Sequence, residues 1–351
     1  MNMALLPPQQ QTSAEALKSQ PITQEFGPTV MPETLLYCHP TRLANIYQPS
    51  IERVFLPSAS IEPDQAKVSI QKSMTPAYTD MANCGLGGRL RTTRERFSRR
   101  PRRELGERLI YDARRSYNNN IAHLIHEHMV LLGYVRQKLG FDHNDIIVIL
   151  DNNAPLLSTD FFREINYETY LTNLEVSGNL LSIDIEETRY LLPYVANIPL
   201  TGFIDSTPEK IFISRSGTRR LLNEPRVASM LAEHGYERFF FEQLSLREQW
   251  SITRNASSIV AIHGAALGML AFQAFNNRSA KAHVVELFTP GLVADVFRKY
   301  MAILGGSWSG CRGKPTPELI KDLESETKFK RHAFSDFELD PKVIELAITA
   351  Q

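Results

Sequence analysis

Several features are missing from this sequence, and each absence excludes a class of protein. Only three cysteines occur, far apart and with no Cys-x-x-Cys pair, so neither a structural zinc site nor a disulfide framework is predicted. No apolar stretch approaches the roughly 20 residues that a membrane-spanning helix needs. The N-terminus lacks the basic and apolar regions of a signal peptide. We therefore expect a cytoplasmic protein, at most peripheral to a membrane.

Net charge and the common catalytic motifs are missing as well. The formal net charge is zero, so the field of the whole molecule does not indicate a polyanionic partner. The dinucleotide motif Gly-x-Gly-x-x-Gly, the Walker phosphate loop and the nucleophile elbow Gly-x-Ser-x-Gly do not occur. A hydrolase that works by covalent catalysis is therefore weakly supported.

What the sequence does contain is an alternation of strand and helix patterns. The apolar run Ile146–Leu150 is typical of a strand buried on both faces. Similar runs recur at Ser258–Ile262 and His283–Phe288, with helical patterns between them. Ser245 and Glu248 have the spacing of a capping box. The alternation predicts an α/β protein with two Rossmann-like domains that face a cleft. Further strands are predicted at residues 34–37, 54–56, 109–111, 180–185, 211–214 and 238–241, and helices at residues 119–138, 158–174, 225–234, 245–256 and 265–275.

The predicted domain organisation has four parts. Residues 1–33 are rich in Gln, Pro, Ser and Thr, which predicts a flexible leader. Residues 34–200 and 201–335 are predicted to form an N-terminal and a C-terminal α/β domain. The last helix, within residues 336–351, could pack back on the first domain.

A candidate phosphate-binding loop follows the predicted strand at residues 211–214. It holds Arg215, Arg219 and Arg220, and arginine donates bidentately to phosphate oxygens. The loop therefore suits a diphosphate, with a solvated basic loop as the alternative. Asn223 either belongs to this site or marks the entry to the next helix.

A second candidate loop follows the strand Ser258–Ile262, where the sequence reads His263-Gly264-Ala265-Ala266-Leu267. Small side chains let a ligand approach the backbone, and N–H groups at the start of a helix attract an anion. The alternative for His263 is a histidine packed in the core. Glu286, in the next strand, could accept hydrogen bonds from ribose hydroxyls or pair with an arginine.

Candidate bases lie on the predicted helix at residues 119–138. His123 and Glu127 share one helical face, and His126 lies near it. A histidine or carboxylate here could deprotonate an acceptor hydroxyl, with histidines packed between helices as the alternative. The segment lacks the second histidine of the zinc motif His-Glu-x-x-His, so it does not match a zinc protease.

The run from Arg89 to Arg103 holds eight arginines against one glutamate. Such a run could contact the phosphates of nucleic acid or anionic lipid. Only Phe97 interleaves it, which serves base stacking poorly. We favour the interpretation that this segment is a solvated connector. If the segment has a function, we expect it to contact a lipid-linked, anionic acceptor at a membrane surface.

The second half of the chain resembles glycosyltransferase family 61, whose shared domain has also been described as a capsular-polysaccharide domain. The resemblance covers about residues 205–290, and Asn120 with His123 resembles the family's upstream Asn/His helix. The matching positions that bear on a donor site are Arg215, Arg219, Arg220, Asn223, Glu248, His263, Gly264, Ala265, Ala266, Leu267 and Glu286. Ala266 departs from the family, in which a third glycine is common at this place.

The resemblance implies an inverting glycosyltransferase of the GT-B type that uses neither a metal nor another cofactor. Its donor would be a nucleotide sugar, and its acceptor a hydroxyl of a glycan, a polysaccharide or a lipid-linked saccharide. Relatives include plant xylan-decorating, O-linked N-acetylglucosaminyl and bacterial polysaccharide transferases. Two alternatives stay open: a catalytically inactive protein that binds a nucleotide sugar, and a nucleic-acid-binding protein that uses the arginine run.

Overall fold

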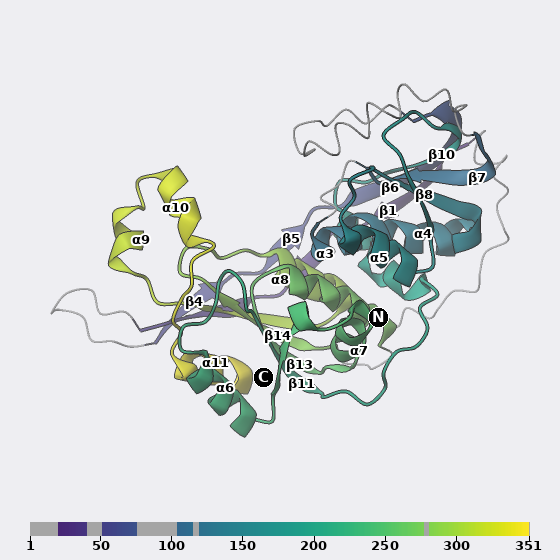
Figure 1. The fold of residues 1–351 in the computed structure, drawn as a ribbon. Coiled ribbons are helices and arrows are strands. Elements are labelled where there is room, and N and C mark those ends of the chain that lie inside the picture. The colour runs from purple at the N-terminus through teal and green to yellow at the C-terminus, as the bar shows by residue number, and fades with distance from the viewer. Residues whose placement is uncertain (1–19, 41–50, 76–103, 115–118, 277–280, 351) are drawn as a thin grey trace. The chain divides into compact units, whose positions relative to one another are not determined.

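A computed structural model describes residues 20–40, 51–75, 104–114, 119–276 and 281–350 of the chain. The chain divides into two compact units, and each holds a large sheet of its own (Figure 1). The first unit extends to Gly27 and then takes Pro63–Thr201. The second takes Pro28–Glu62 and the chain from Gly202 onward. The run from Arg89 to Arg103 lies outside the described residues.

The first unit is built on a six-stranded sheet in the order β1-β6-β10-β7-β8-β9. The four strands from β10 to β9 pair in parallel, whereas β1 and β6 are antiparallel additions at one edge. The strands are β1 (Ile22–Phe26), β6 (Asp64–Met74), β7 (Glu104–Asp112), β8 (Ile146–Leu150), β9 (Glu168–Leu171) and β10 (Ser177–Asp184). The helices are α3 (Ile121–His123), the π-helical turn η2 (Leu124–Met129), α4 (Val130–Leu139), α5 (Leu156–Glu164) and the 3₁₀ segments η3 (His143–Asp145) and η4 (Thr188–Asn197).

Apolar patterning accounts for the centre of this unit. All five side chains of β8 are buried, as expected for a parallel strand covered on both faces. The long helix after β7 begins where the Asn120 side chain accepts a hydrogen bond from the Ala122 backbone N–H. It ends at Gly140, whose φ of 74° is the left-handed conformation that closes many helices. The predicted strand and helix are both confirmed.

The helix predicted at residues 158–174 is wrong in its second half. Helix α5 ends at Glu164, and the strand β9 (Glu168–Leu171) follows and pairs in parallel with β8. Asn166 stands between them with a φ of 65°, a left-handed conformation that a continuing helix cannot contain.

The second unit is built on a seven-stranded sheet in the order β12-β11-β13-β14-β15-β3-β4, in which only β4 is antiparallel to its neighbour. The strands are β3 (Thr34–Cys38), β4 (Glu52–Leu56), β11 (Lys210–Ser214), β12 (Glu237–Phe240), β13 (Ser258–Ile262), β14 (His283–Phe288) and β15 (Ser307–Arg312), and β2 (Thr29–Met31) pairs with β5 (Ala59–Ile61) in a small separate sheet. The helices are α6 (Glu224–Glu233), α7 (Leu246–Asn255), α8 (Val296–Leu304), α9 (Pro317–Lys321), α10 (Glu326–His332), α11 (Pro341–Thr349) and the 3₁₀ segments η5 (Phe241–Gln243) and η6 (Ala265–Phe275).

The strand order of the second sheet shows where a ligand is expected. From β11 the chain passes to β12 on one side and then crosses to β13 on the other. In open α/β sheets the crevice outside the carboxyl ends of two such strands is the usual binding place. The loops after β11 and β13 border this switch point, and they carry the arginine loop and the His263–Leu267 segment.

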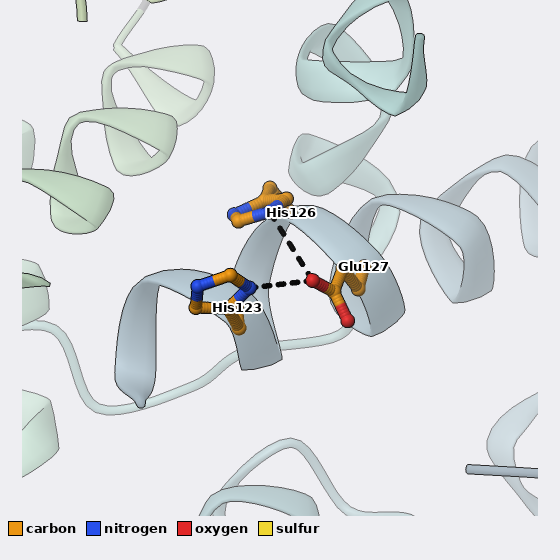
Figure 2. A group of neighbouring side chains, drawn as sticks. All are labelled: His123, His126 and Glu127. Atoms are coloured by element: carbon orange, nitrogen blue, oxygen red, sulfur yellow. Dashed lines mark hydrogen bonds and ion pairs between the residues drawn. The ribbon is translucent and has the colours of Figure 1, made fainter. Parts of the chain in front are cut away.

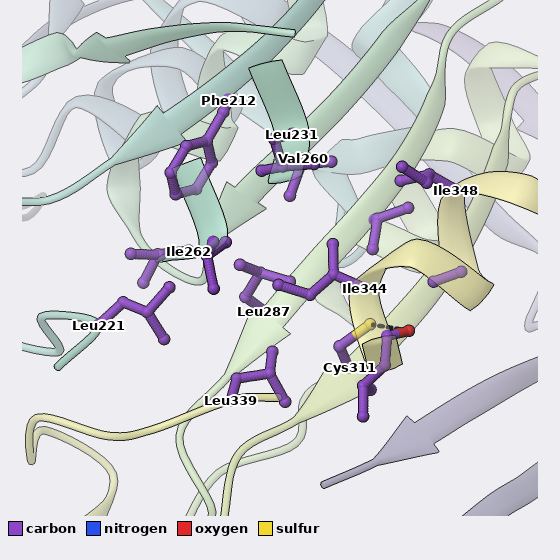
Figure 3. Close-up of a cluster of buried hydrophobic side chains, with 14 of the residues drawn as sticks. Phe212, Leu221, Leu231, Val260, Ile262, Leu287, Cys311, Leu339, Ile344 and Ile348 are labelled. Carbon is purple, nitrogen blue, oxygen red and sulfur yellow. Dashed lines mark hydrogen bonds between the residues drawn. The ribbon is translucent and has the colours of Figure 1, made fainter. Parts of the chain in front are cut away.

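The N-terminal and C-terminal segments complete the second unit. β3 pairs in parallel with β15, and α11 packs on α6, β3, β14 and β15. Figure 3 shows the core that results, in which Ile344 and Ile348 of α11 join side chains of the sheet strands. The sequence allowed this last helix to pack back on the first domain. In the structure it packs within the second unit.

Ordered strands also occur within residues 1–33, whose composition predicted a flexible leader. β1 pairs with β6 from Ile22 opposite Val68 to Phe26 opposite Asp64. Composition misses such strands because their partners lie about 40 residues downstream and give no local signal. The two mainly parallel sheets confirm the α/β class. No helix in the described part of the chain combines the length and apolarity that crossing a lipid bilayer requires.

Candidate functional site

The arginine loop and the His263 segment meet at the switch point of the second unit. Arg215 Nη1 donates a hydrogen bond to the backbone carbonyl oxygen of His263 at 3.0 Å, and Arg219 Nη1 donates to the same oxygen at 3.2 Å. Arg219 also donates through Nε to the Ala333 carbonyl at 2.8 Å, and its guanidinium lies 4.7 Å from the ring centre of Phe334. Two cationic groups from one loop thus converge on a single neutral acceptor of the other.

The charge on these two arginines is poorly neutralised. Neither forms an ion pair with any described residue, and burial lowers the pKa of both, with Arg215 lowering that of Arg219 further. Arg215 Nε is buried and has no hydrogen-bond partner among the described residues. A buried donor without a partner costs about 1–3 kcal/mol. Arg215 and Arg219 therefore form a half-buried cationic site to which an anion would add stabilising contacts.

Gly264 allows the close approach of Arg215. A Cβ atom at this position would stand 1.9 Å from Arg215 Nη1, so any larger residue would displace the guanidinium. Immediately afterwards the 3₁₀ segment η6 begins with the small residues Ala265 and Ala266, both partly exposed, while Leu267 is buried. Backbone N–H groups at the start of such a segment offer donors to an anion. This geometry supports the phosphate-binding interpretation of the segment.

His263 is held by a chain of hydrogen bonds. Its Nδ1 lies 2.5 Å from Oε1 of Glu286, and the other carboxylate oxygen accepts from Trp308 Nε1 at 2.8 Å. Glu286 is fully buried, and the His263 ring stacks on Phe288 with ring centres 5.3 Å apart. The carboxylate fixes the ring orientation and leaves Nε2, which contacts no other described residue through a hydrogen bond, as the nitrogen available to a ligand.

Trp308 and Phe288 were not predicted as site residues. Phe288 ends the predicted strand His283–Phe288 that carries Glu286, but Trp308 comes from β15, where no chemical motif stands out. Glu286 does not pair with an arginine among the described residues; its carboxylate contacts a histidine and a tryptophan. Only strand pairing, with Glu286 opposite Gly310, brings Trp308 within reach.

Three predicted donor-site residues have local partners away from this cluster. Arg220 forms an exposed ion pair with Asp336 at 2.7 Å. Asn223 donates to the Leu339 carbonyl at 2.8 Å and accepts from the Leu339 N–H at 3.2 Å, which attaches the segment before α11. Glu248 completes the predicted capping box of α7, because its carboxylate accepts from the Ser245 N–H at 2.8 Å. The structure gives each of them a stabilising contact and does not bring them to Arg215.

The candidate bases of the first unit form one cluster, which Figure 2 shows. His123 Nδ1 lies 2.5 Å from Glu127 Oε1, and His126 Nε2 lies 3.5 Å from the same oxygen. Burial raises the pKa of Glu127, but hydrogen bonds from His126 and His123 outweigh it and lower the pKa to about 2. The carboxylate is therefore ionised at neutral pH and holds the His123 ring in place.

His128 belongs to the core and not to this cluster. Its Nδ1 lies 2.8 Å from the Tyr111 hydroxyl, and it is 2% exposed. Burial lowers its pKa to about 4. The interpretation of histidines packed inside the fold therefore applies to His128, whereas His123 and His126 are partly exposed.

The pKa of His128 predicts a loss of stability in mild acid. The unfolded chain takes up a proton on this histidine near pH 6.5 and the folded chain only near pH 4. Protonation between these values favours unfolding, by roughly 3 kcal/mol at the lower end. We expect the free energy of unfolding to fall from pH 6.5 to pH 4, and to fall less steeply in His128→Gln. Denaturant unfolding at both pH values checks this; equal slopes in the two proteins would contradict it.

Comparison with known protein families gives a match over much of the chain. The family model described as Glycosyltransferase 61 matches residues 23–278 of the chain, more than half of its length. The match spans the first-unit cluster, the arginine loop and the His263 segment, and it ends before Glu286. A search of curated proteins finds no significant match.

Proposed function

The chain belongs to the glycosyltransferase 61 family, which implies glycosyltransferase activity; from this premise we propose that it transfers a sugar from a nucleotide-sugar donor to a saccharide hydroxyl with inversion at the anomeric carbon. The observation that carries the proposal is the convergence of Arg215 and Arg219 on the His263 carbonyl at the switch point of the second sheet. The acceptor hydroxyl would belong to a glycan, a polysaccharide or a lipid-linked saccharide. The GT-B arrangement is part of the same proposal.

The leaving diphosphate would be bound by the cationic site of the second unit. As the bond from the anomeric carbon to the diphosphate oxygen breaks, its electron pair passes to that oxygen and negative charge grows there. Arg215 and Arg219 are already half-buried and fixed, so they could stabilise this charge with little reorganisation. Backbone N–H groups at Ala265 and Ala266 would supply further donors.

His263 would contact the donor through Nε2. Its other nitrogen is held by Glu286, so the ring does not have to be ordered when the ligand binds. Because both oxygens of Glu286 are engaged within the protein, we assign it the positioning of His263 in preference to a contact with ribose.

The base would come from the first unit, and we assign it to His123. A general base works best when its pKa lies near the operating pH, and a carboxylate with a pKa of about 2 is a weak proton acceptor. We assign Glu127 the orientation of His123, because its carboxylate contacts Nδ1 of that ring and carboxylates orient catalytic histidines in other enzymes. His123 would take the proton of the acceptor hydroxyl while the oxygen attacks the anomeric carbon.

A turnover assay over a panel of nucleotide sugars tests this function. We expect one donor to release its nucleoside diphosphate, with sugar transferred to a saccharide acceptor. Binding of a nucleotide sugar without release or transfer would instead support an inactive binding protein. If no member of the panel binds or reacts, the proposal is overturned.

Gly264→Ala is expected to weaken donor binding while leaving the fold intact. The added Cβ overlaps the guanidinium end of the Arg215 side chain, which would lose its hydrogen bond to the His263 carbonyl and turn away without a shift of the backbone. Loss of one charged hydrogen bond to the diphosphate raises Kd by about 10- to 100-fold. Gly217→Ala is the matched control, because a Cβ at this other glycine of the site would meet nothing within 4 Å. Equal affinities of the two variants in a calorimetric titration would refute this role of Gly264.

A further inference from the structure

We propose that His123, His126 and Glu127 also bind one divalent transition-metal ion of the zinc class. Within the described residues these three side chains are the group whose ligand atoms could hold a metal, since one atom of each lies within 4.8 Å of the other two. Two imidazoles and a carboxylate are ligands that Zn²⁺ accepts, and three protein ligands leave a position for water.

The local helix geometry produces this grouping. His123 ends α3, and the π-helical turn η2 carries His126 and Glu127 before α4 resumes the regular helix. A π-helical turn inside an α-helix is rare and occurs frequently at functional sites. The spacing i, i+3, i+4 places all three groups on one side of the helix, as Figure 2 shows. A search for His-Glu-x-x-His does not detect this spacing.

The distances fit a metal after a small adjustment. Two ligands of a tetrahedral ion about 2.1 Å away stand roughly 3.4 Å apart. His126 Nε2 and Glu127 Oε1 are already separated by 3.5 Å. His123 Nδ1 and Glu127 Oε1 are 2.5 Å apart. An ion would replace that hydrogen bond, and the distance between the two atoms would have to increase by about 1 Å.

The surroundings let an ion reach the cluster. The side chains of His123, His126 and Glu127 are 31%, 17% and 27% exposed. The cluster is thus open enough for an ion to enter from solvent. It is also shielded enough to limit competition from water. His128, the third histidine on this helix, is buried against Tyr111 and takes no part.

Metal binding would regulate transfer, and this consequence rests on the proposed function. An ion bound at Nδ1 of His123 leaves the proton of the neutral ring on Nε2, so that nitrogen has no lone pair for proton abstraction, and the ion also takes Glu127 away from orienting the ring. We therefore expect Zn²⁺ to inhibit transfer and a chelator to restore it.

Competition against a chromogenic zinc chelator measures binding directly and without turnover. The purified full chain, first stripped of metal, should take up one Zn²⁺. His126→Ala and Glu127→Gln should each weaken this binding by about tenfold or more. Replacing a residue that only hydrogen-bonds to a metal ligand already lowers metal affinity by about 10- to 100-fold. His332→Ala is the matched control: it removes a histidine that pairs with Asp322 at 3.0 Å but belongs to no group of three possible metal ligands in the described part of the chain. It should bind Zn²⁺ like the wild type.

Equal Zn²⁺ binding by the wild type, His126→Ala and Glu127→Gln, with all three folded by circular dichroism, would overturn the metal site. So would the absence of any binding to the wild type. An enzyme that turns over and binds Zn²⁺ at this site without inhibition would overturn the regulatory part. A chain without turnover under any condition contradicts the proposed function instead, and the binding measurement still decides on the site.

Discussion

Replacing Arg215 by alanine is expected to lower kcat/KM for sugar transfer by about 10²- to 10³-fold, the usual cost of losing one preorganised donor to a developing anion. Arg215 contributes a half-buried charge whose only described hydrogen bond goes to the His263 carbonyl at 3.0 Å, and its Nε has no partner among the described residues. A steady-state assay with the reactive donor of the panel measures the loss.

The fold should survive this change. Arg215 has no ion pair to lose among the described residues, and removal of its buried, unpaired Nε relieves a cost. Arg215→Lys separates charge from geometry: lysine keeps the charge but cannot donate bidentately, so activity should lie between those of the wild type and the alanine variant. Arg226→Ala, at an exposed position of α6, controls for a change in net charge. Wild-type kcat/KM in a folded Arg215→Ala protein would remove Arg215 from the site.

His123→Ala is expected to lower kcat by about 10²- to 10⁴-fold, the contribution typical of a positioned general base. The expectation follows from the 2.5 Å contact with the ionised Glu127 carboxylate, which fixes the orientation of the His123 ring. Donor binding should be unchanged, because the cationic site belongs to the second unit. Transfer rates at saturating donor, together with donor affinity, separate the two effects.

Two further variants make the assignment specific. Glu127→Gln keeps the size of the side chain and removes its charge, so it should lower kcat by disturbing His123. His143→Ala also removes a histidine that pairs with a carboxylate in the first unit, that of Asp142, and it should leave kcat near the wild-type value. A His123→Ala enzyme with undiminished kcat would show that the base is another group.

The sequence predicted those elements whose signals are local. The apolar run of β13 and the capping box of Ser245 and Glu248 are both confirmed, because burial on two faces and a helix start each leave a pattern within a few residues. The placement of β3 beside β15 could not be predicted. This pairing places Leu36 opposite Gly310, more than 270 residues away in the sequence. It could not be predicted because the sequence of a short apolar strand does not indicate which other strand it pairs with.

The same distinction applies to the candidate site. Position after a strand end sufficed to single out Arg215, Arg219, His263 and Gly264, since the carboxyl ends of parallel strands meet at one edge. It did not separate them from Arg220, whose side chain turns to Asp336. The contact of Trp308 with Glu286 depends on strand pairing and on the direction of two buried side chains. Neither can be predicted from the sequence of the two strands.

Calorimetric titration of the wild type and Arg215→Ala with nucleoside diphosphates tests the central claim most directly. The account predicts that at least one nucleoside diphosphate binds the wild type, and that Arg215→Ala weakens its affinity about tenfold or more through loss of a charge-assisted contact. If no nucleoside diphosphate binds, or if both proteins bind it equally, the loops after β11 and β13 are not the donor site.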